Sequence, residues 1–321
     1  MKQPLVSIVI PCYNGEDFVA DAINSALAQT YPHTEVVVID DGSTDNSGAV
    51  IASFGDAVSW QAEPNRGGAA ARNLGISQCR GEFVQFLDAD DVLLADKLSK
   101  QVPLAVAEPK MLSYTDHYFR AESEQARLRR GRSVTAVDPF IFVLEHRTLT
   151  VSGPLYPRSW LNRIGGFRDG MRASQEFEMN LRMAELMSTL NAQFVHIDEP
   201  LFEVRRRQGS VSSDTAKTLA ALVDPLEHML AEGTALDPEF VARRAAFAVY
   251  CASIGRLCLR GGERESGLRL IALGERVDKA AAEHSAWGGW SRIAKRAFGA
   301  EAVEGLATLR SRLRGRKSMR H

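Results

Sequence analysis

The 321-residue chain has few cysteines and no run of 18 uncharged apolar residues. Its cysteines form no CxxC pair, so we expect buried free thiols at Cys12, Cys79, Cys251 and Cys258 and no structural zinc. Without a long apolar run, a membrane-spanning helix is not expected. The first strand-like segment stops at Pro11, too soon for a signal peptide, and we therefore expect a cytoplasmic protein.

An excess of charge of one sign is also missing, since the formal net charge is −1. The balance is uneven, because residues 285–321 carry nine Lys or Arg against two Glu, whereas residues 1–284 are acidic. The same segment contains Trp287, Trp290 and Phe298, a combination typical of a basic amphipathic segment that binds an anionic membrane surface. A solvated tail is the alternative. No nucleic-acid-binding motif accompanies the basic residues, and we expect no nucleic acid partner.

Apolar segments dominate the first hundred residues, and strand and helix patterns alternate there. Continuous apolar runs at 5–11, 35–40 and 83–87 predict strands, with helical spacing at 15–30 and 69–78 between them. Continuous rather than alternating apolar strands predict a parallel sheet covered on both faces, which binds ligands beyond the carboxyl ends of its strands. The fold class is therefore α/β with a mostly parallel central sheet.

The rest of the chain divides near residue 212. After about residue 215 the strand patterns vanish, which predicts an α-helical extension over 213–284 and then the basic tail, 285–321. Before the boundary, the expected elements are a helix near 94–106, a strand at 110–119, a loop at 121–137, a helix at 174–187 and two short strands around Pro200.

Acidic residues follow two of the predicted strands. Asp40 and Asp41 end one, and Asp88, Asp90 and Asp91 follow the other. Carboxylates this close stay ionised together only when a cation or hydrogen-bond donors compensate them. Mg²⁺ prefers one or two carboxylates plus substrate phosphates. We therefore expect a divalent metal (Mn²⁺ or Mg²⁺) at a phosphate site, and we assign Asp91 to capping the next helix.

Five motifs carry a family resemblance, in this order: "VSIVIPCYNGEDFVADAINSALAQTY", "VVVIDDGSTDNS", "NRGGAAARNLGI", "GEFVQFLDADD" and "IGGF". Over about residues 4–212 the chain resembles family 2 glycosyltransferases, inverting enzymes of the Rossmann-like GT-A fold that use nucleotide sugars. The resemblance implies that Pro11 and Tyr13 line the nucleobase pocket. It also implies that Asp41, with Asp40 beside it, accepts a hydrogen bond from the base, and that Arg72 lies near the nucleotide.

The same resemblance assigns the diphosphate end of the site. Asp88 and Asp90 form the DxD pair; the first usually reaches ribose or sugar, and the second holds the metal against the diphosphate. Arg207 stands where many relatives have a histidine. Arginine does not ligate a metal, but it can neutralise a leaving diphosphate through bidentate hydrogen bonds. A solvated basic run is the alternative for this segment.

An inverting transfer needs a base, and the family commonly supplies it from a Glu–Asp pair after "GGF". Here Gln175 and Glu176 occupy those positions, so we assign Glu176 as the base. Asp169 is the reserve candidate, and Glu178 is expected to form surface or structural ion pairs.

The resulting expectation is an inverting glycosyltransferase (EC 2.4, hexosyltransferase class) acting on a nucleotide-sugar donor, with UDP-sugars favoured. Its acceptor would be a glycan or lipid-linked molecule in the synthesis of cell-surface polysaccharide or lipopolysaccharide. The basic tail would place the enzyme peripherally at the inner face of the membrane. Two alternatives stay open. One is a nucleotide-binding protein with a degenerate site, suggested by Gln175 and the missing histidine, and the other is an interaction module with a basic tail.

Overall fold

The computed structural model describes most of the chain before the basic tail. The described residues are 3–121, 125–130, 138–145, 149–171, 173–206, 215–232, 236 and 240–286. Arg207 and residues 287–321 of the tail lie outside the described residues, so what was predicted for this arginine and for the tail stays a prediction. The chain divides into two compact units, Met1–Ser210 and Val211–His321.

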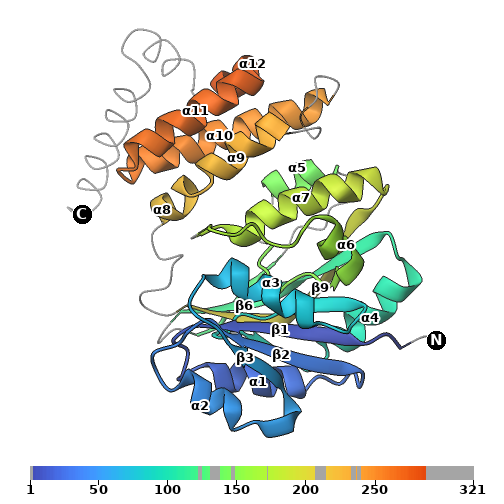
Figure 1. The fold of residues 1–321 in the computed structure, drawn as a ribbon. Helices are drawn as coiled ribbons and strands as arrows, with labels where there is room; N and C mark the ends of the chain where they lie inside the picture. The colour runs from blue at the N-terminus through green and yellow to red at the C-terminus, as the bar shows by residue number, and fades with distance from the viewer. Residues whose placement is uncertain are drawn as a thin grey trace, which may run out of the picture. The chain divides into compact units, whose positions relative to one another are not determined.

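A five-stranded sheet forms one part of unit 1, in the order β3-β2-β1-β4-β8 (Figure 1). All neighbours are parallel except β4 and β8, which confirms the α/β prediction with a mostly parallel sheet. The strands are β1 (Val6–Cys12), β2 (Thr34–Asp40), β3 (Ser59–Ala62), β4 (Phe83–Phe86) and β8 (Tyr156–Pro157).

Helices cover both faces of this sheet, which explains why β1 and β2 are mostly apolar. α1 and α2 lie on one face and α3 on the other (Figure 1). Val36 and Val38 of β2 pack in the core with α1, whereas Val37 packs with Ala71 of α3. At Gly75 of α3 a Cβ atom would lie 2.4 Å from a side-chain atom of β1, so a glycine is needed for this close approach. The helices are α1 (Val19–Leu27), α2 (Ser47–Ala52), a 3₁₀ turn (Gly55–Ala57) and α3 (Gly68–Gln78).

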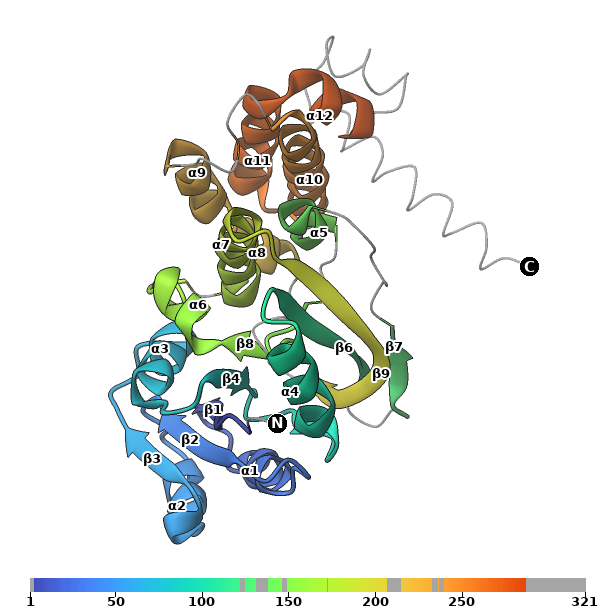
Figure 2. The ribbon, with the colours of Figure 1, turned by 90° about the vertical axis from the view of Figure 1, so that its right-hand side faces the viewer.

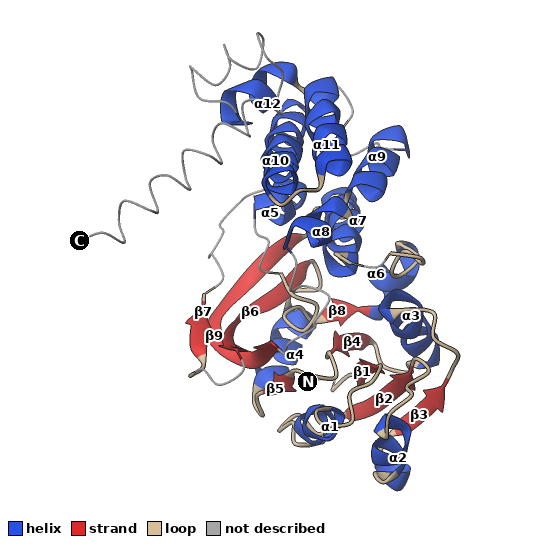
Figure 3. Ribbon diagram, turned by 90° about the vertical axis from the view of Figure 1, so that its left-hand side faces the viewer, coloured by secondary structure: helices blue, strands red, loops and turns tan. Residues whose placement is uncertain are grey.

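A second sheet, in the order β5-β9-β6-β7, completes unit 1 (Figure 3). Sequence reasoning was wrong on two of its strands: a single strand, β9, runs through Pro200, and β7 lies within the expected loop. The β6–β9 register shifts next to the Asp116–Pro200 pair. Proline has no N–H to donate to a neighbouring strand, so it is tolerated where the hydrogen-bond ladder is already interrupted. The elements are β5 (Val92–Leu93), α4 (Lys97–Ala107), β6 (Met111–Ala121), β7 (Arg127–Arg129), α5 (Pro139–Glu145), α6 (Arg158–Arg163), α7 (Gln175–Thr189) and β9 (Gln193–Arg206).

Unit 2 is helical wherever it is described, and α10 and α11 form its central hairpin (Figure 2). The chain reverses at Gly261 and Gly262, and the positive φ of Gly262 (90°) suits a glycine. Gly255 and Gly267 lie at a close approach of the two helices, since a Cβ on Gly255 would meet the Gly267 carbonyl oxygen at 2.7 Å. The helices are α8 (Thr215–Ala220), α9 (Val223–Glu232), α10 (Val241–Arg260), α11 (Arg264–Val277) and α12 (Lys279–Ala286).

Two expectations about composition can be compared with the described residues. Cys12, Cys79, Cys251 and Cys258 are all buried free thiols, as predicted. Burial raises the pKa of the Cys12 and Cys79 thiols to about 11 and that of Cys251 well above its usual value. Across the described helices, none combines the length and the apolar character that crossing a bilayer requires.

Candidate active site

The candidate residues for binding the nucleobase lie at or just after the carboxyl ends of β1 and β2, which are neighbours in the first sheet. Pro11 is near the end of β1, and Tyr13 directly after it is 47% exposed, so its ring is available for stacking. Asp40 ends β2 and Asp41 follows it. The backbone N–H of Asp41 donates to the carbonyl of Cys12 (2.8 Å), which continues the pairing of the two strands beyond their ends.

The carboxylates of Asp40 and Asp41 are buried and fix two turns. Asp40 Oδ1 accepts the backbone N–H of Ser43 at 3.0 Å. Asp41 accepts the N–H groups of Arg66 and Gly67, one on each oxygen and both at 2.8 Å. Asp41 thus holds the Gly-rich turn that begins α3, a role that sequence reasoning missed. A carboxylate has about four acceptor positions, so this role leaves room for the predicted hydrogen bond from a nucleobase.

The three aspartates after β4 occupy different environments. The Asp88 side chain is 37% exposed and Asp90 is partly exposed, whereas Asp91 is buried at 4%. Burial raises the pKa of Asp91 well above its usual value, and the charges of Asp88 and Asp90 act in the same direction. The prediction that Asp91 caps the next helix is wrong. β5 follows Asp91 directly, and Asp96 occupies the N-cap position of α4.

The donor set of Asp88 and Asp90 suits a divalent metal that is also bound by diphosphate oxygens. Two carboxylates, at least partly open to solvent, leave most coordination positions to the ligand and water. In the part of the chain that the structure describes, one cluster of three potential ligands lies elsewhere: Asp116, His196 and Asp198. There Asp116 and His196 are hydrogen-bonded at 2.7 Å, and Asp198 pairs with Arg130 at 3.1 Å. The protein therefore already engages those groups.

Arg72 joins the DxD turn to the start of α7. Its Nη2 pairs with Asp88 Oδ1 at 2.5 Å, and its Nη1 donates to Gln175 Oε1 at 2.9 Å. The guanidinium carbon also lies 5.4 Å from the centre of the Phe167 ring. The structure therefore brings together three residues that sequence reasoning placed in the site or beside the base. Arg72 is held mainly by protein groups, since its side chain is 12% exposed.

Glu176, the predicted base, is the second residue of α7 and is partly buried. Burial raises its pKa, and the charge of Asp88 acts in the same direction; the backbone N–H of Glu176 and the charge of Arg72 oppose them. A carboxylate with a raised pKa is a stronger proton acceptor. Ser174, just before the helix, has a positive φ of 56°. Such a conformation is costly for a residue with a side chain and frequently occurs next to functional groups.

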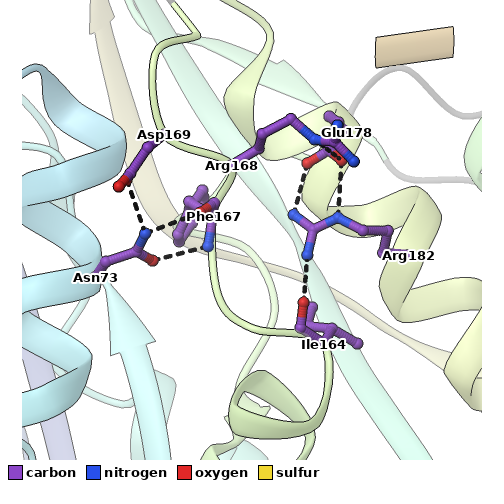
Figure 4. A network of polar contacts seen from close by, with 7 residues as sticks. All are labelled: Asn73, Ile164, Phe167, Arg168, Asp169, Glu178 and Arg182. Atoms are coloured by element: carbon purple, nitrogen blue, oxygen red, sulfur yellow. Dashed lines mark hydrogen bonds and ion pairs between the residues drawn. The ribbon is translucent and has the colours of Figure 1, made fainter. Parts of the chain in front are cut away.

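Figure 4 shows how the remaining acids of this region are engaged. Glu178 is 2% exposed and accepts hydrogen bonds from Arg182 (2.7 and 2.6 Å) and Arg168 (3.1 Å), so it forms the expected structural ion pairs. Asp169, the reserve candidate, is exposed and accepts a hydrogen bond from Asn73 Nδ2 at 3.2 Å. Its carboxylate thus contacts α3 from the turn before α7.

Asn73 is a further positioning residue that sequence reasoning did not assign, although it lies in the quoted "ARN" motif. Its Oδ1 accepts the Phe167 N–H and its Nδ2 donates to the Phe167 carbonyl, both at 2.8 Å (Figure 4). Gly166 has a φ of 69°, and a Cβ there would lie 2.4 Å from Asn73 Oδ1. Gly166 of the "GGF" motif therefore leaves room for the Asn73 side chain, and Asn73 holds Phe167 against the Arg72 guanidinium.

Comparisons with known proteins agree with this architecture. Residues 1–349 of S. aureus TarS, solved in complex with UDP-GlcNAc, superpose with a TM-score of 0.54 at 18% identity, and the match covers 86% of this chain and 91% of that TarS chain. Mannosyltransferase PcManGT from Pyrobaculum calidifontis, in complex with GDP-Man and Mn²⁺, superposes with a TM-score of 0.57 at 16% identity, covering 98% and 88% of the two chains. At these identities the likeness shows the fold, which is of the GT-A type.

Sequence comparisons identify the family. A putative teichuronic acid biosynthesis glycosyltransferase, TuaG from Bacillus subtilis (strain 168), is 34% identical over 125 residues, which are 37% of this chain and 49% of TuaG. The model of glycosyl transferase family 2 matches residues 7–168, half of the chain. The chain belongs to glycosyl transferase family 2, as its motifs predicted.

Proposed function

We propose that this chain transfers a sugar from a nucleotide-sugar donor to a glycan or lipid-linked acceptor, with inversion at the anomeric carbon. The arrangement around Arg72 carries this proposal. One guanidinium binds both Asp88 of the DxD pair and Gln175, the residue before the candidate base. The predicted diphosphate end and the predicted base are therefore linked through a single side chain in a family 2 protein.

In this reaction Glu176 takes the proton of the acceptor hydroxyl as its oxygen attacks the sugar. Burial favours the task, because it raises the pKa of the carboxyl above its ordinary value and so makes the carboxylate a stronger base. Tyr13, Pro11 and Asp41 would bind the nucleoside. A Mn²⁺ or Mg²⁺ ion held by Asp88 and Asp90 would neutralise the diphosphate leaving group, and Arg207 is proposed to assist it.

Gln175 is the main reason to consider a degenerate, nucleotide-binding site instead, and its contacts argue against that alternative. Its Oε1 accepts from Arg72 at 2.9 Å, while its Nε2 donates to the carbonyl of Met171 at 2.7 Å. A glutamate at this position would keep the hydrogen bond from Arg72. It would, however, place a carboxylate oxygen against the Met171 carbonyl, and both of these groups are acceptors. The amide thus fits this site better than the acid that relatives commonly have.

Several finer points of the proposal rest on the comparisons and the sequence. The complexes of TarS with UDP-GlcNAc and of PcManGT with GDP-Man support a nucleotide-sugar donor, and the Mn²⁺ in the second supports the metal; the preference for a UDP-sugar rests on the sequence. TuaG supports a role in cell-surface polysaccharide synthesis. We propose a catalytic domain over 1–212, a helical extension over 213–284 and a tail over 285–321. The tail's positive charge would bind the anionic inner face of the membrane, where a lipid-linked acceptor is found.

Turnover tests the proposal. UDP-, GDP- and dTDP-sugars are screened for thermal stabilisation of the protein with Mn²⁺, and release of nucleotide from the stabilising donor is then measured. Glu176→Gln serves as the matched variant, because it keeps the shape of the side chain but removes the base. We expect at least one donor to stabilise both proteins and the wild type to release nucleotide faster. If a donor binds but both proteins release nucleotide at the same background rate, the degenerate nucleotide-binding site is favoured. If no donor stabilises the protein, both the transferase and the nucleotide-binding proposals are contradicted.

A further inference from the structure

Asp91 closes the turn after β4, next to the DxD pair, but its surroundings differ from those of Asp88 and Asp90. Its backbone N–H donates to the carbonyl of Asp88 at 3.0 Å, which closes the turn. Its side chain is buried, whereas the Asp88 side chain is 37% exposed. A buried carboxylate needs hydrogen-bond donors, and the identity of these donors shows what Asp91 does.

Two segments far away in the sequence supply the donors. Asp91 Oδ1 accepts the backbone N–H of Arg205 in β9 at 3.1 Å, and Oδ2 accepts the hydroxyl of Ser152 at 3.3 Å. Ser152 is itself fixed to β4, because Gln85 Nε2 donates to its carbonyl oxygen at 2.9 Å. The carboxylate therefore ties the DxD turn to β9 and to the segment that leads into β8.

The contact with Arg205 continues a short ladder between two strands. β5 pairs with β9 in an antiparallel manner, and the Leu94 N–H donates to the Leu201 carbonyl at 2.9 Å. Beyond this ladder, Asp91 binds the Arg205 backbone, and Asp21 (2.7 Å) and Glu203 (3.1 Å) bind the Arg205 guanidinium. Arg205 is thus fixed through both its backbone and its side chain, two residues before Arg207.

We infer that Asp91 is a positioning residue that sets the place of the metal-binding aspartates relative to β9 through its two hydrogen bonds, and that it is not itself a metal ligand. The inference rests on the proposed function of the same site. A turn fixed at both ends presents Asp88 and Asp90 in place before a diphosphate arrives, so less ordering is needed on binding. The same tether fixes the point from which the chain continues to Arg207.

Two substitutions at Asp91 distinguish positioning from ligation. Asp91→Ala removes both hydrogen bonds. Asp91→Asn keeps both, since its Oδ1 can accept the Arg205 N–H and its Nδ2 can donate to the Ser152 hydroxyl, which accepts as well as donates. We expect alanine to weaken Mn²⁺-dependent nucleotide binding about tenfold and asparagine to stay within about twofold of the wild type.

The experiment is calorimetric titration of the full chain with UDP and with GDP, each with and without Mn²⁺. The increase in affinity that Mn²⁺ causes is the readout, because general loosening of the fold would weaken binding equally in both conditions. Ser152→Ala, a small change that removes one of the two bonds, should reduce this increase by a smaller factor. Asp56→Ala removes an exposed carboxylate elsewhere in unit 1 and should behave as the wild type.

Each result decides the matter. A reduced Mn²⁺ effect in Asp91→Ala and Ser152→Ala, with a normal effect in Asp91→Asn, supports positioning. If Asp91→Asn is as damaging as Asp91→Ala, the charge itself acts and the inference is wrong; an unchanged Mn²⁺ effect in Asp91→Ala overturns it too. If Asp91→Ala does not fold, Asp91→Asn and Ser152→Ala decide by the same criteria. Failure of the wild type to bind either nucleotide overturns the proposed site together with this inference, whereas the other negative results leave the proposed function standing.

Discussion

Replacing Glu178 by alanine should destabilise unit 1 without removing a catalytic group. The substitution removes three charge-assisted hydrogen bonds from a carboxylate that is 2% exposed. Removing one partner of a buried ion pair costs about 3–5 kcal/mol when the other charge stays buried. Here Arg168 and Arg182 are 32% and 20% exposed and can turn toward water, so we expect the lower end, about 3 kcal/mol.

The expected loss can be measured by calorimetry. For a unit of this size, 1 kcal/mol corresponds to about 2–4 °C, so the transition of unit 1 should fall by about 6–12 °C. Glu178→Gln keeps one acceptor oxygen and should fall less, and Asp56→Ala, at an exposed site, should change little. Turnover by the Glu178 variants, measured well below their transitions, should stay near that of the wild type. A Glu178→Ala protein with wild-type stability but no turnover would show that the acid acts in the reaction.

Four further predictions concern the site and the tail. Glu176→Gln should keep donor binding but lower transfer about 10²-fold or more; a wild-type rate would exclude Glu176 as the base, and Asp169 would be tested next. The base must be ionised to act, and its pKa is raised. As the pH is lowered, kcat/KM should therefore begin to fall at a pH above the ordinary glutamate range, and a fall that begins only within that range would contradict the assignment. Asp90→Ala should abolish the effect of Mn²⁺ on nucleotide affinity in calorimetry, and an unchanged effect would remove Asp90 from the site. Truncation after His284 should abolish sedimentation with anionic vesicles at low salt and spare nucleotide binding, because each basic residue near such a surface contributes about 1 kcal/mol; equal sedimentation of both proteins would make the tail a solvated extension.

Local pattern was sufficient for the elements of the first sheet. β1 and most of β2 are buried on both faces, so their sequences are largely apolar and predict parallel strands without further information. The second sheet was harder, because its strands depend on partners distant in sequence. β9 continues through Pro200 only because its pairing with β6 is irregular there, and nothing near Pro200 in the sequence indicates this.

The candidate site shows the same division. Motif positions nominated Asp88, Arg72 and Glu176 as candidates, but they did not reveal which groups hold these residues. Asp91 was assigned to a helix end because a helix pattern follows it, whereas its partners lie 61 and 114 residues away. Gln175 looked like a lost acid until its two hydrogen bonds could be traced. Such roles depend on which backbone N–H or carbonyl groups come within about 3 Å, and sequence spacing does not contain that distance.

The buried cysteines have a practical consequence for following this protein in solution. Thiol-reactive probes react with the thiolate. At neutral pH the raised pKa values of Cys12, Cys79 and Cys251 keep these thiols protonated, and their burial keeps probes away from them. Cys258 is buried as well. The natural chain therefore serves as an unreactive background for labelling. A single cysteine introduced at an exposed position such as Leu268 can carry a fluorophore or spin label, and no native residue has to be replaced first.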